Sequence, residues 1–138
     1  MRAFKLAGLV LPLALVAGAC SGEIANIPTT PDPVTVTETF TGTLNINGAA
    51  THTFFTTATG TVTATLISLG ESPPAMVGLS MGTLSGSTCS LVLTNDRATV
   101  ASIVSGTVTT LQGSLCVRIY DVGSLTASVP YEIRVEHK

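Results

Sequence analysis

The sequence predicts an all-β domain of antiparallel strands, folded as a sandwich or a barrel. From Val34 onward, β-branched residues dominate and apolar residues recur at every second position, as in half-buried strands. Turn-forming residues interrupt this pattern about every eight to twelve residues, which is the strand spacing of such folds. No stretch after Val34 keeps an apolar period of about 3.6 residues for three turns, so helices are not expected.

Residues 1–19 have the three parts of a secretory signal peptide. Positive charge lies in MRAFK, an apolar run follows in LAGLVLPLALVA, and small residues precede Cys20. The uncharged run over residues 6–22 contains Pro12 and three glycines and barely reaches the length of a membrane-spanning helix. We therefore expect a removable leader rather than a retained anchor helix.

Cys20 fits two kinds of processing. The residues AGA before it satisfy the small-x-small rule of ordinary signal peptidase, which would release a soluble protein that begins with a free cysteine. The stretch VAGAC also resembles the lipobox of bacterial lipoproteins, in which the cysteine is acylated, with Ala17 where that family prefers leucine. The chain has three cysteines, and acylation of Cys20 leaves Cys89 and Cys116 as one pair for an oxidising compartment. We therefore expect Cys20 to carry the lipid that holds the protein on a membrane.

Residues 20–33 are expected to form the lipidated N-terminus and a proline-rich linker, and residues 34–138 the folded domain. Asn47 and Gly48 tolerate the positive φ of a tight hairpin turn, and extended segments flank them on both sides. The strand candidates are residues 34–44, 49–55, 60–69, 76–81, 89–94, 99–104, 107–111, 114–121 and 129–137.

The last two candidates show their faces most clearly. Leu115, Val117 and Ile119 share one side of a strand, and Cys116 falls on the opposite side with Arg118. A disulfide between Cys89 and Cys116 therefore needs a second layer or a loop that covers the outer face. We expect this pair to be joined, because two exported thiols would otherwise be exposed to oxidation and no metal partner is visible in the sequence.

The strand pattern resembles the bacterial pre-peptidase C-terminal domain over about residues 37–137. The residues that carry the resemblance are Phe40, Gly42 and Leu44, then Phe54, Phe55, Gly60 and Val62, then Gly113, Leu115 and Val117, and finally Tyr131, Ile133 and Val135. The resemblance implies a jelly-roll-like β-sandwich of about seven to nine strands. It also implies a noncatalytic module of the kind appended to secreted peptidases and other hydrolases, some of which bind collagen or calcium. The match is incomplete, because Leu115 stands at an aromatic position of the family and no cluster of calcium-binding acids is visible.

The residues indicate no catalytic, metal or cofactor site. The only histidines are His52, which is expected to face solvent, and His137, which is expected to lie on a frayed end. Asp96 and Asp121 lie in predicted turns, where carboxylates usually accept local backbone hydrogen bonds. The net charge of −2, without a basic cluster, argues against nucleic-acid binding.

Two functions remain as expectations. The first is a membrane-tethered extracytoplasmic lipoprotein that acts as a noncatalytic binding or structural module for an envelope or extracellular protein or glycan. The second is an accessory subunit of a separate secreted peptidase or other hydrolase. Ser21 after the lipobox favours the outer membrane of the bacterial envelope. Any binding site is expected on residues 70–76 and 120–126, because loops tolerate irregular polar geometry.

Overall fold

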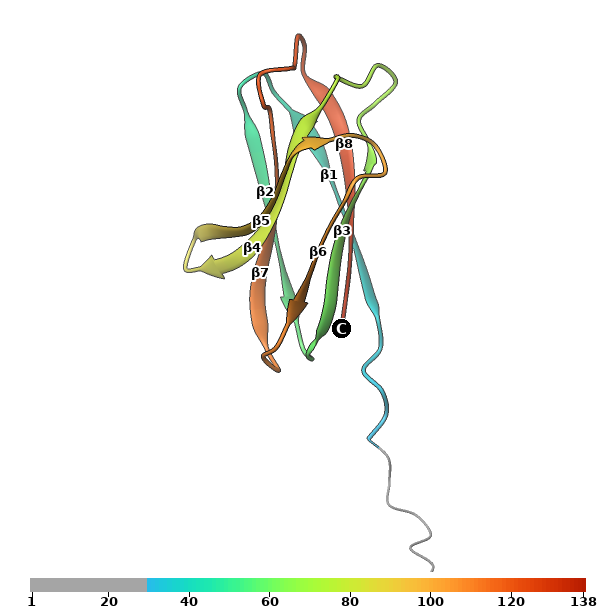
Figure 1. Cartoon of the computed structure of the whole chain (residues 1–138), viewed down its shortest axis with the longest axis vertical. Coiled ribbons are helices and arrows are strands. Elements are labelled where there is room, and N and C mark those ends of the chain that lie inside the picture. Colours follow the sequence, from blue (N-terminus) through green and yellow to red (C-terminus); the bar gives the residue numbers. More distant parts are fainter. Residues whose placement is uncertain (1–29) are drawn as a thin grey trace, which may run out of the picture. The chain divides into compact units, whose positions relative to one another are not determined.

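The computed structural model describes residues 30–138 (Figure 1). The predicted leader over residues 1–19 and the predicted lipidation site at Cys20 lie outside the described residues. Residues Asp32–Lys138 form one compact unit. This unit holds eight strands: β1 (Val36–Leu44), β2 (Ala49–Thr56), β3 (Gly60–Ser68), β4 (Val77–Ser85), β5 (Thr88–Ala98), β6 (Ile103–Val108), β7 (Gly113–Tyr120) and β8 (Val129–His137).

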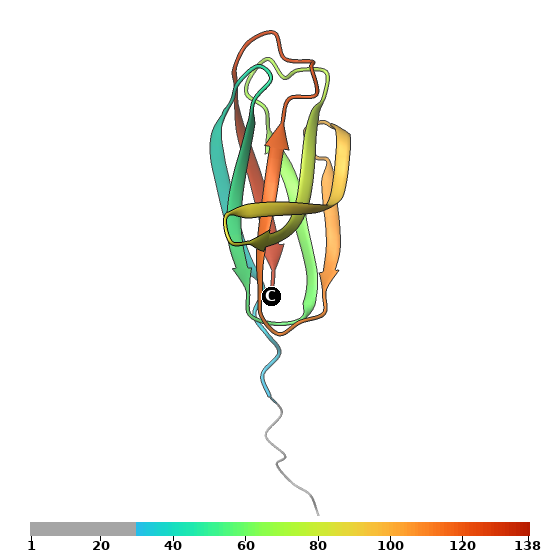
Figure 2. The same cartoon turned by 90° about the vertical axis from the view of Figure 1, so that its left-hand side faces the viewer.

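The strands form two antiparallel sheets of four, which face each other as a β-sandwich (Figures 1 and 2). One sheet has the order β1-β8-β3-β6 and the other β2-β7-β4-β5, which is the order of a jelly roll. The predicted sandwich is therefore confirmed. Because β1 pairs with β8, β2 with β7, β3 with β6 and β4 with β5, the chain is one long hairpin rolled into two layers.

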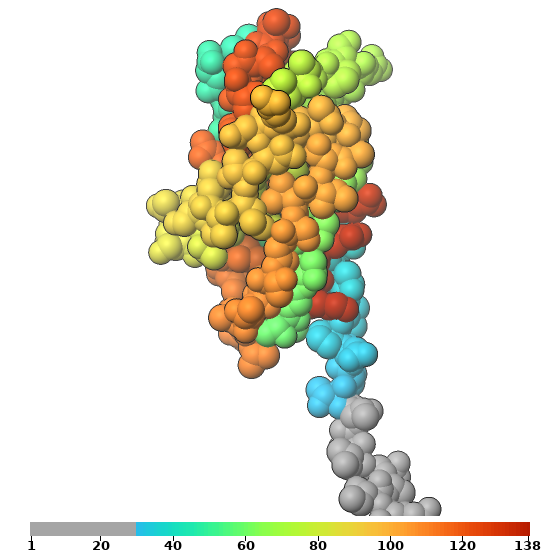
Figure 3. All heavy atoms as spheres, viewed as in Figure 1, coloured from blue at the N-terminus to red at the C-terminus, as the bar shows by residue number. Residues whose placement is uncertain are grey.

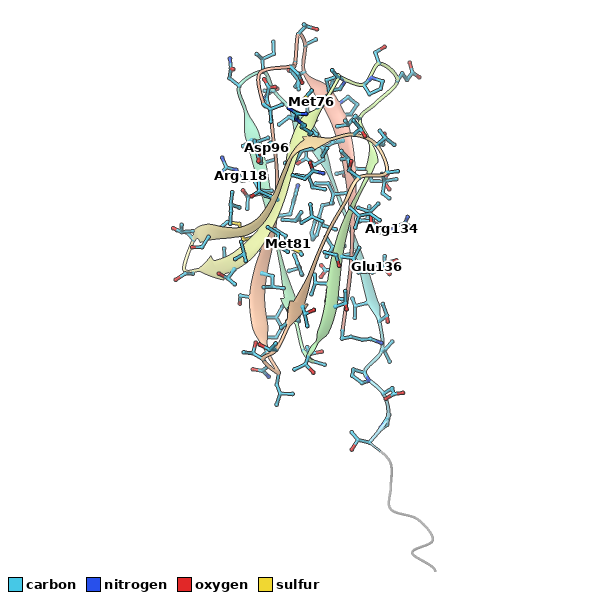
Figure 4. The ribbon with its side chains drawn as sticks, in the orientation of Figure 1. Met76, Met81, Asp96, Arg118, Arg134 and Glu136 are labelled. Carbon is cyan, nitrogen blue, oxygen red and sulfur yellow. A yellow bond between two sulfur atoms is a disulfide. The ribbon has the colours of Figure 1, made fainter. Side chains whose placement is uncertain are left out.

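Period-two alternation produces the core. On β7, Leu115, Val117 and Ile119 are buried between the sheets, as the sequence predicts. On β8, the outward residues Arg134 and Glu136 project away from the other sheet in Figure 4. The other buried apolar residues include Leu44, Phe54, Val62, Ala64, Leu66, Val77, Leu79, Met81, Val104, Tyr131, Ile133 and Val135.

The turn at Asn47 and Gly48 does not join a hairpin, so this prediction is wrong. The amide of Gly48 donates to the carbonyl of Asn45 at 2.9 Å, and Asn47 has the positive φ of 54° that the sequence suggests. However, β1 lies in one sheet and β2 in the other. Local turn chemistry reverses the chain, whereas the distant partners β8 and β7 determine which sheet each strand joins.

The candidates at residues 99–104 and 107–111 are replaced by a single strand, β6, between them. Residues 99–102 form a turn that bonds to β3, with the amide of Ala101 donating to the carbonyl of Leu66 at 2.8 Å. Gly106 does not break the strand. A Cβ atom at this position would lie 2.7 Å from Cδ1 of Leu93, so glycine allows β5 to approach β6 closely.

Candidate functional site

Cys89 and Cys116 lie at disulfide distance, with their Sγ atoms 2.04 Å apart. Cys116 points outward from β7, as the alternation predicts, yet none of its surface is exposed. The register between β4 and β5 shifts at Gly82, which is paired with Leu91 although Met81 is paired with Leu93. Such a bulge bends a hairpin. The β4–β5 hairpin brings Cys89 to Cys116 and covers the outer face of β7 at this position (Figure 2). It is the covering element that the predicted disulfide requires.

Both loops predicted to bind, residues 70–76 and 120–126, lie at the same end of the sandwich (Figure 1). We call this end the loop pole and define it by residues 45–48, 70–76 and 121–128. Met76 marks it in Figure 4, and the hydroxyl of Ser124 donates to the carbonyl of Met76. A small pocket of about 180 Å³ lies between the two loops and is lined by Ser72, Pro73, Pro74, Ser124, Leu125, Thr126, Ala127 and Val129.

Asp121 organises the loop pole. Its Oδ1 accepts backbone N–H bonds from Gly123, Ser124 and Leu125 at 2.8, 2.9 and 3.2 Å, and its Oδ2 accepts one from Asn47 at 2.8 Å. These donors, with the Asn47 amide first, hold the pKa of the carboxyl below its usual value. The prediction that Asp121 accepts local backbone hydrogen bonds is confirmed, and the bond to Asn47 also joins two loops.

Asp96 has a different partner. The prediction that it lies in a turn is wrong, because it lies on β5, and the hydroxyl of Tyr120 on β7 donates to its carboxylate. Burial, this hydrogen bond and the charge of Asp96 raise the pKa of Tyr120 to about 12, against the opposing charge of Arg118. Among residues 30–138, no three His, Cys, Asp or Glu side chains are grouped as metal ligands.

The two histidines lie at the seam between the sheets, and not at the exposed positions expected from the sequence. His52 is half-buried, stacks on Phe40 with ring centroids 4.9 Å apart, and its Nε2 lies 2.7 Å from the hydroxyl of Tyr131. Burial lowers its pKa. His137 is 3% exposed, and its Nε2 lies 2.9 Å from Oε1 of Glu38. The predictions of a solvent-facing His52 and a frayed His137 are therefore wrong, since both side chains belong to the packing between β1, β2 and β8.

The period-two pattern contained the signal for this seam. His52 shares its strand face with the buried Phe54, and His137 shares one with the buried Ile133 and Val135. Both rings lie within an aromatic cluster, because the ring of His137 is 5.4 Å from that of Phe54. A structural role as packed, hydrogen-bonded side chains therefore explains both histidines.

A second concave surface, for which the sequence has no recognisable motif, lies between β5 and β6. It is a groove of about 390 Å³, and Figure 3 shows the face that carries it, with β5 in yellow and β6 in orange. Val62, Met81 and Leu115 belong to its lining and come from the core. Its other lining residues are Gly82, Thr83, Val92, Leu93, Gly106, Thr107, Val108, Thr109, Thr110, Gly113 and Ser114.

The groove exists because the β4–β5 hairpin, which stays paired, bends away from β6. Leu93 contacts Gly106, and on the side of this contact that is farther from the loop pole, the bulge at Gly82 turns the β4–β5 hairpin away from the sandwich. The edge of β6 is then left without a neighbour on that side. The groove could not be predicted from the sequence, because a bulge and a free strand edge both depend on pairing between distant residues.

Over residues 30–138, no helix is long and apolar enough to cross a membrane. No protein-family model and no curated protein matches the chain.

Proposed function

We propose that the domain is a noncatalytic binding module, held at a bacterial cell envelope by lipid on Cys20 and presenting its loop pole to an envelope protein or glycan. The observation that carries this proposal is the position of the loop pole relative to the start of the domain. β1 begins at Val36 and runs toward the loop pole, which it reaches at Leu44 (Figure 1). Its nine residues span roughly 30 Å at the usual rise of a strand. The loop pole is therefore at the end of the domain opposite to the start of β1, where a tether on the N-terminal side would join it.

The cysteine pairing supports the tether. The chain has three cysteines, and two of them lie at disulfide distance from each other. Cys20 is thus left without a partner in its own chain, which suits a cysteine that is acylated. A free thiol at this position would be open to oxidation in an exported protein.

The construction of the loop pole supports binding there. Asp121 fixes the 121–125 segment through its three backbone bonds and ties it to the β1–β2 turn through Asn47. The hydroxyl of Ser128 donates to Oδ1 of Asn45 at 2.8 Å and adds a second link. Loops held in one conformation lose little entropy when they bind a partner, so this end is preorganised for recognition.

The binding proposal is tested by capture with the full-length protein on purified envelope glycans and on the host's secreted proteins. We expect specific capture that is lost in Ser72→Arg and in Thr126→Arg, both of which change exposed residues of the loop pole. Thr57→Arg is the matched control, because Thr57 is also exposed but lies in the turn after β2, at the opposite end. Capture that survives both loop-pole variants would contradict the proposal, and selective recovery of a hydrolase would favour an accessory subunit.

The tether is tested separately by detergent-phase partitioning. We expect the wild type to enter the detergent phase and Cys20→Ala to remain in the aqueous phase, because acyl chains contribute about 0.8 kcal/mol per buried methylene. Aqueous partitioning of both proteins would rule out the lipid anchor without affecting the proposal for the loop pole.

A further inference from the structure

We infer that the groove between β5 and β6 binds an extended, uncharged peptide segment of a partner protein, which adds to the free edge of β6 as a further strand. This site is separate from the loop pole and does not depend on the lipid anchor. Three features of the described residues carry the inference: the unprotected edge of β6, the uncharged lining of the groove, and the position of β5.

The edge of β6 lacks the devices that protect exposed strand edges. β6 pairs only with β3, so its other edge has backbone N–H and C=O groups without a strand partner. Proteins usually guard such edges with charges, prolines or bulges. β1 carries Glu38 and β2 carries His52 on their inward faces, and β5 has register shifts and a disulfide cysteine. The sequence of β6, IVSGTV, has none of these features.

The lining of the groove selects the chemistry of the occupant. None of its fourteen residues is charged, and apolar side chains from both sheets are joined by threonine and serine hydroxyls. Val92 of the β5 wall is 68% exposed. A charged ligand group would lose hydration here without gaining a counter-ion, so the inserted side chains must be neutral and mainly apolar. The volume of about 390 Å³ is at the lower end for a ligand site and suits a few small side chains.

A strand edge next to an apolar groove is the arrangement that β-strand addition requires. Backbone hydrogen bonds to the edge supply affinity, and alternate side chains of the peptide enter the groove and supply specificity. Gly106, Thr107 and Val108 contribute both to the edge and to the groove. The added strand would therefore run beside this half of β6.

The position of β5 favours a single peptide over a second folded copy. Leu93 lies against Gly106, so β5 meets β6 at this residue, and the groove continues from there along residues 107–110. The sheet edge of a second domain would meet β5 there. An isolated peptide strand needs only the open half of β6, at the usual strand spacing of about 4.8 Å.

The test uses full-length protein carrying Cys20→Ala, labelled with ¹⁵N, and the acetylated and amidated peptide Val-Thr-Val-Thr-Val as the probe. We expect the peptide to shift the amide resonances of residues 106–110 and to slow amide exchange in β6. A peptide with proline at the central position should bind at least about tenfold more weakly, because proline cannot donate a ladder hydrogen bond.

The variant Val92→Asp places a charge in the groove wall at a side chain whose exposure makes the fold tolerant of the change. We expect it to weaken peptide binding at least about tenfold. Val100→Asp is the matched control, because Val100 is 46% exposed in the turn after β5 and does not line the groove.

Absence of binding at millimolar peptide would overturn the inference, as would shifts confined to the loop pole or equal binding of the proline peptide. Analytical sedimentation of the protein without peptide tests the other possible occupant of the groove, which is a second copy of the chain. A dimer that Val92→Asp dissociates would assign the groove to a second copy and would also refute the peptide site. None of these outcomes bears on capture through the loop pole.

Discussion

Reduction of the Cys89–Cys116 bridge should destabilise the domain by an amount that follows from the length of chain it closes. The two cysteines are 27 positions apart. Loop-closure entropy for a loop of this length, −2.1 − 1.5R ln n, gives about 3.5 kcal/mol at 25 °C. For a domain of this size, such a loss lowers Tm by roughly 15 °C. The bridge also fixes the bent β4–β5 hairpin on β7, so its loss should loosen this hairpin first.

The assay is denaturant unfolding with and without a phosphine reductant, together with amide exchange of the oxidised and reduced protein. The double variant Cys89→Ala and Cys116→Ala is the control, because the reductant should leave its stability unchanged. We expect faster exchange over residues 83–92 in the reduced protein. A stability loss below about 1 kcal/mol, with unchanged exchange in the hairpin, would refute the reasoning, since loop closure alone predicts several times that value.

Three further predictions concern single side chains. Gly78→Ala should cost about 1–3 kcal/mol of unfolding free energy, because its Cβ would lie 2.1 Å from the Tyr120 ring, and the cost should fall in a Tyr120→Ala background. Burial lowers the pKa of His52, so the stability it contributes is present above about pH 6.5 and is lost as the pH falls through the lowered value. Unfolding midpoints of His52→Phe should therefore decline less on acidification than those of the wild type, and equal slopes would contradict this. Asp121→Ala should speed amide exchange at residues 123–125, and unchanged exchange would show that the carboxylate does not hold the loop.

The faces of individual strands were predictable because they depend on residues two positions apart. The alternation in β7 and β8 identified the core sides of both strands, and the same rule applied to β2 would have turned His52 inward beside Phe54. The pairing of strands was not predictable in this way. Thr and Val alternate in several strands, so a strand such as β1 carries no local mark that selects β8 over β2.

The candidate site was predictable only in part, for the same reason. The two loops at residues 70–76 and 120–126 could be recognised from proline, glycine and aspartate, which disfavour strand ladders. The groove beside β6 could not be recognised, because it arises where a bulge on β5 and a glycine on β6 meet across the fold. The cover over Cys116 has the same origin, since it depends on the bend of a hairpin rather than on the strand that carries the cysteine.

The rolled hairpin determines the order in which the domain can close as the chain is made. Among the eight strands of residues 30–138, β4 and β5 are the only consecutive pair that shares a sheet, whereas Val36 of β1 pairs with His137 of β8. The first strand to leave the ribosome must therefore wait for the last one before it finds its partner. Long-range pairing of this kind makes folding slow, and unpaired strands stay exposed in the meantime. Loss of residues 135–137 would leave the beginning of β1 without a partner, so shortening of β8 should destabilise the pairing on which the sheet closes.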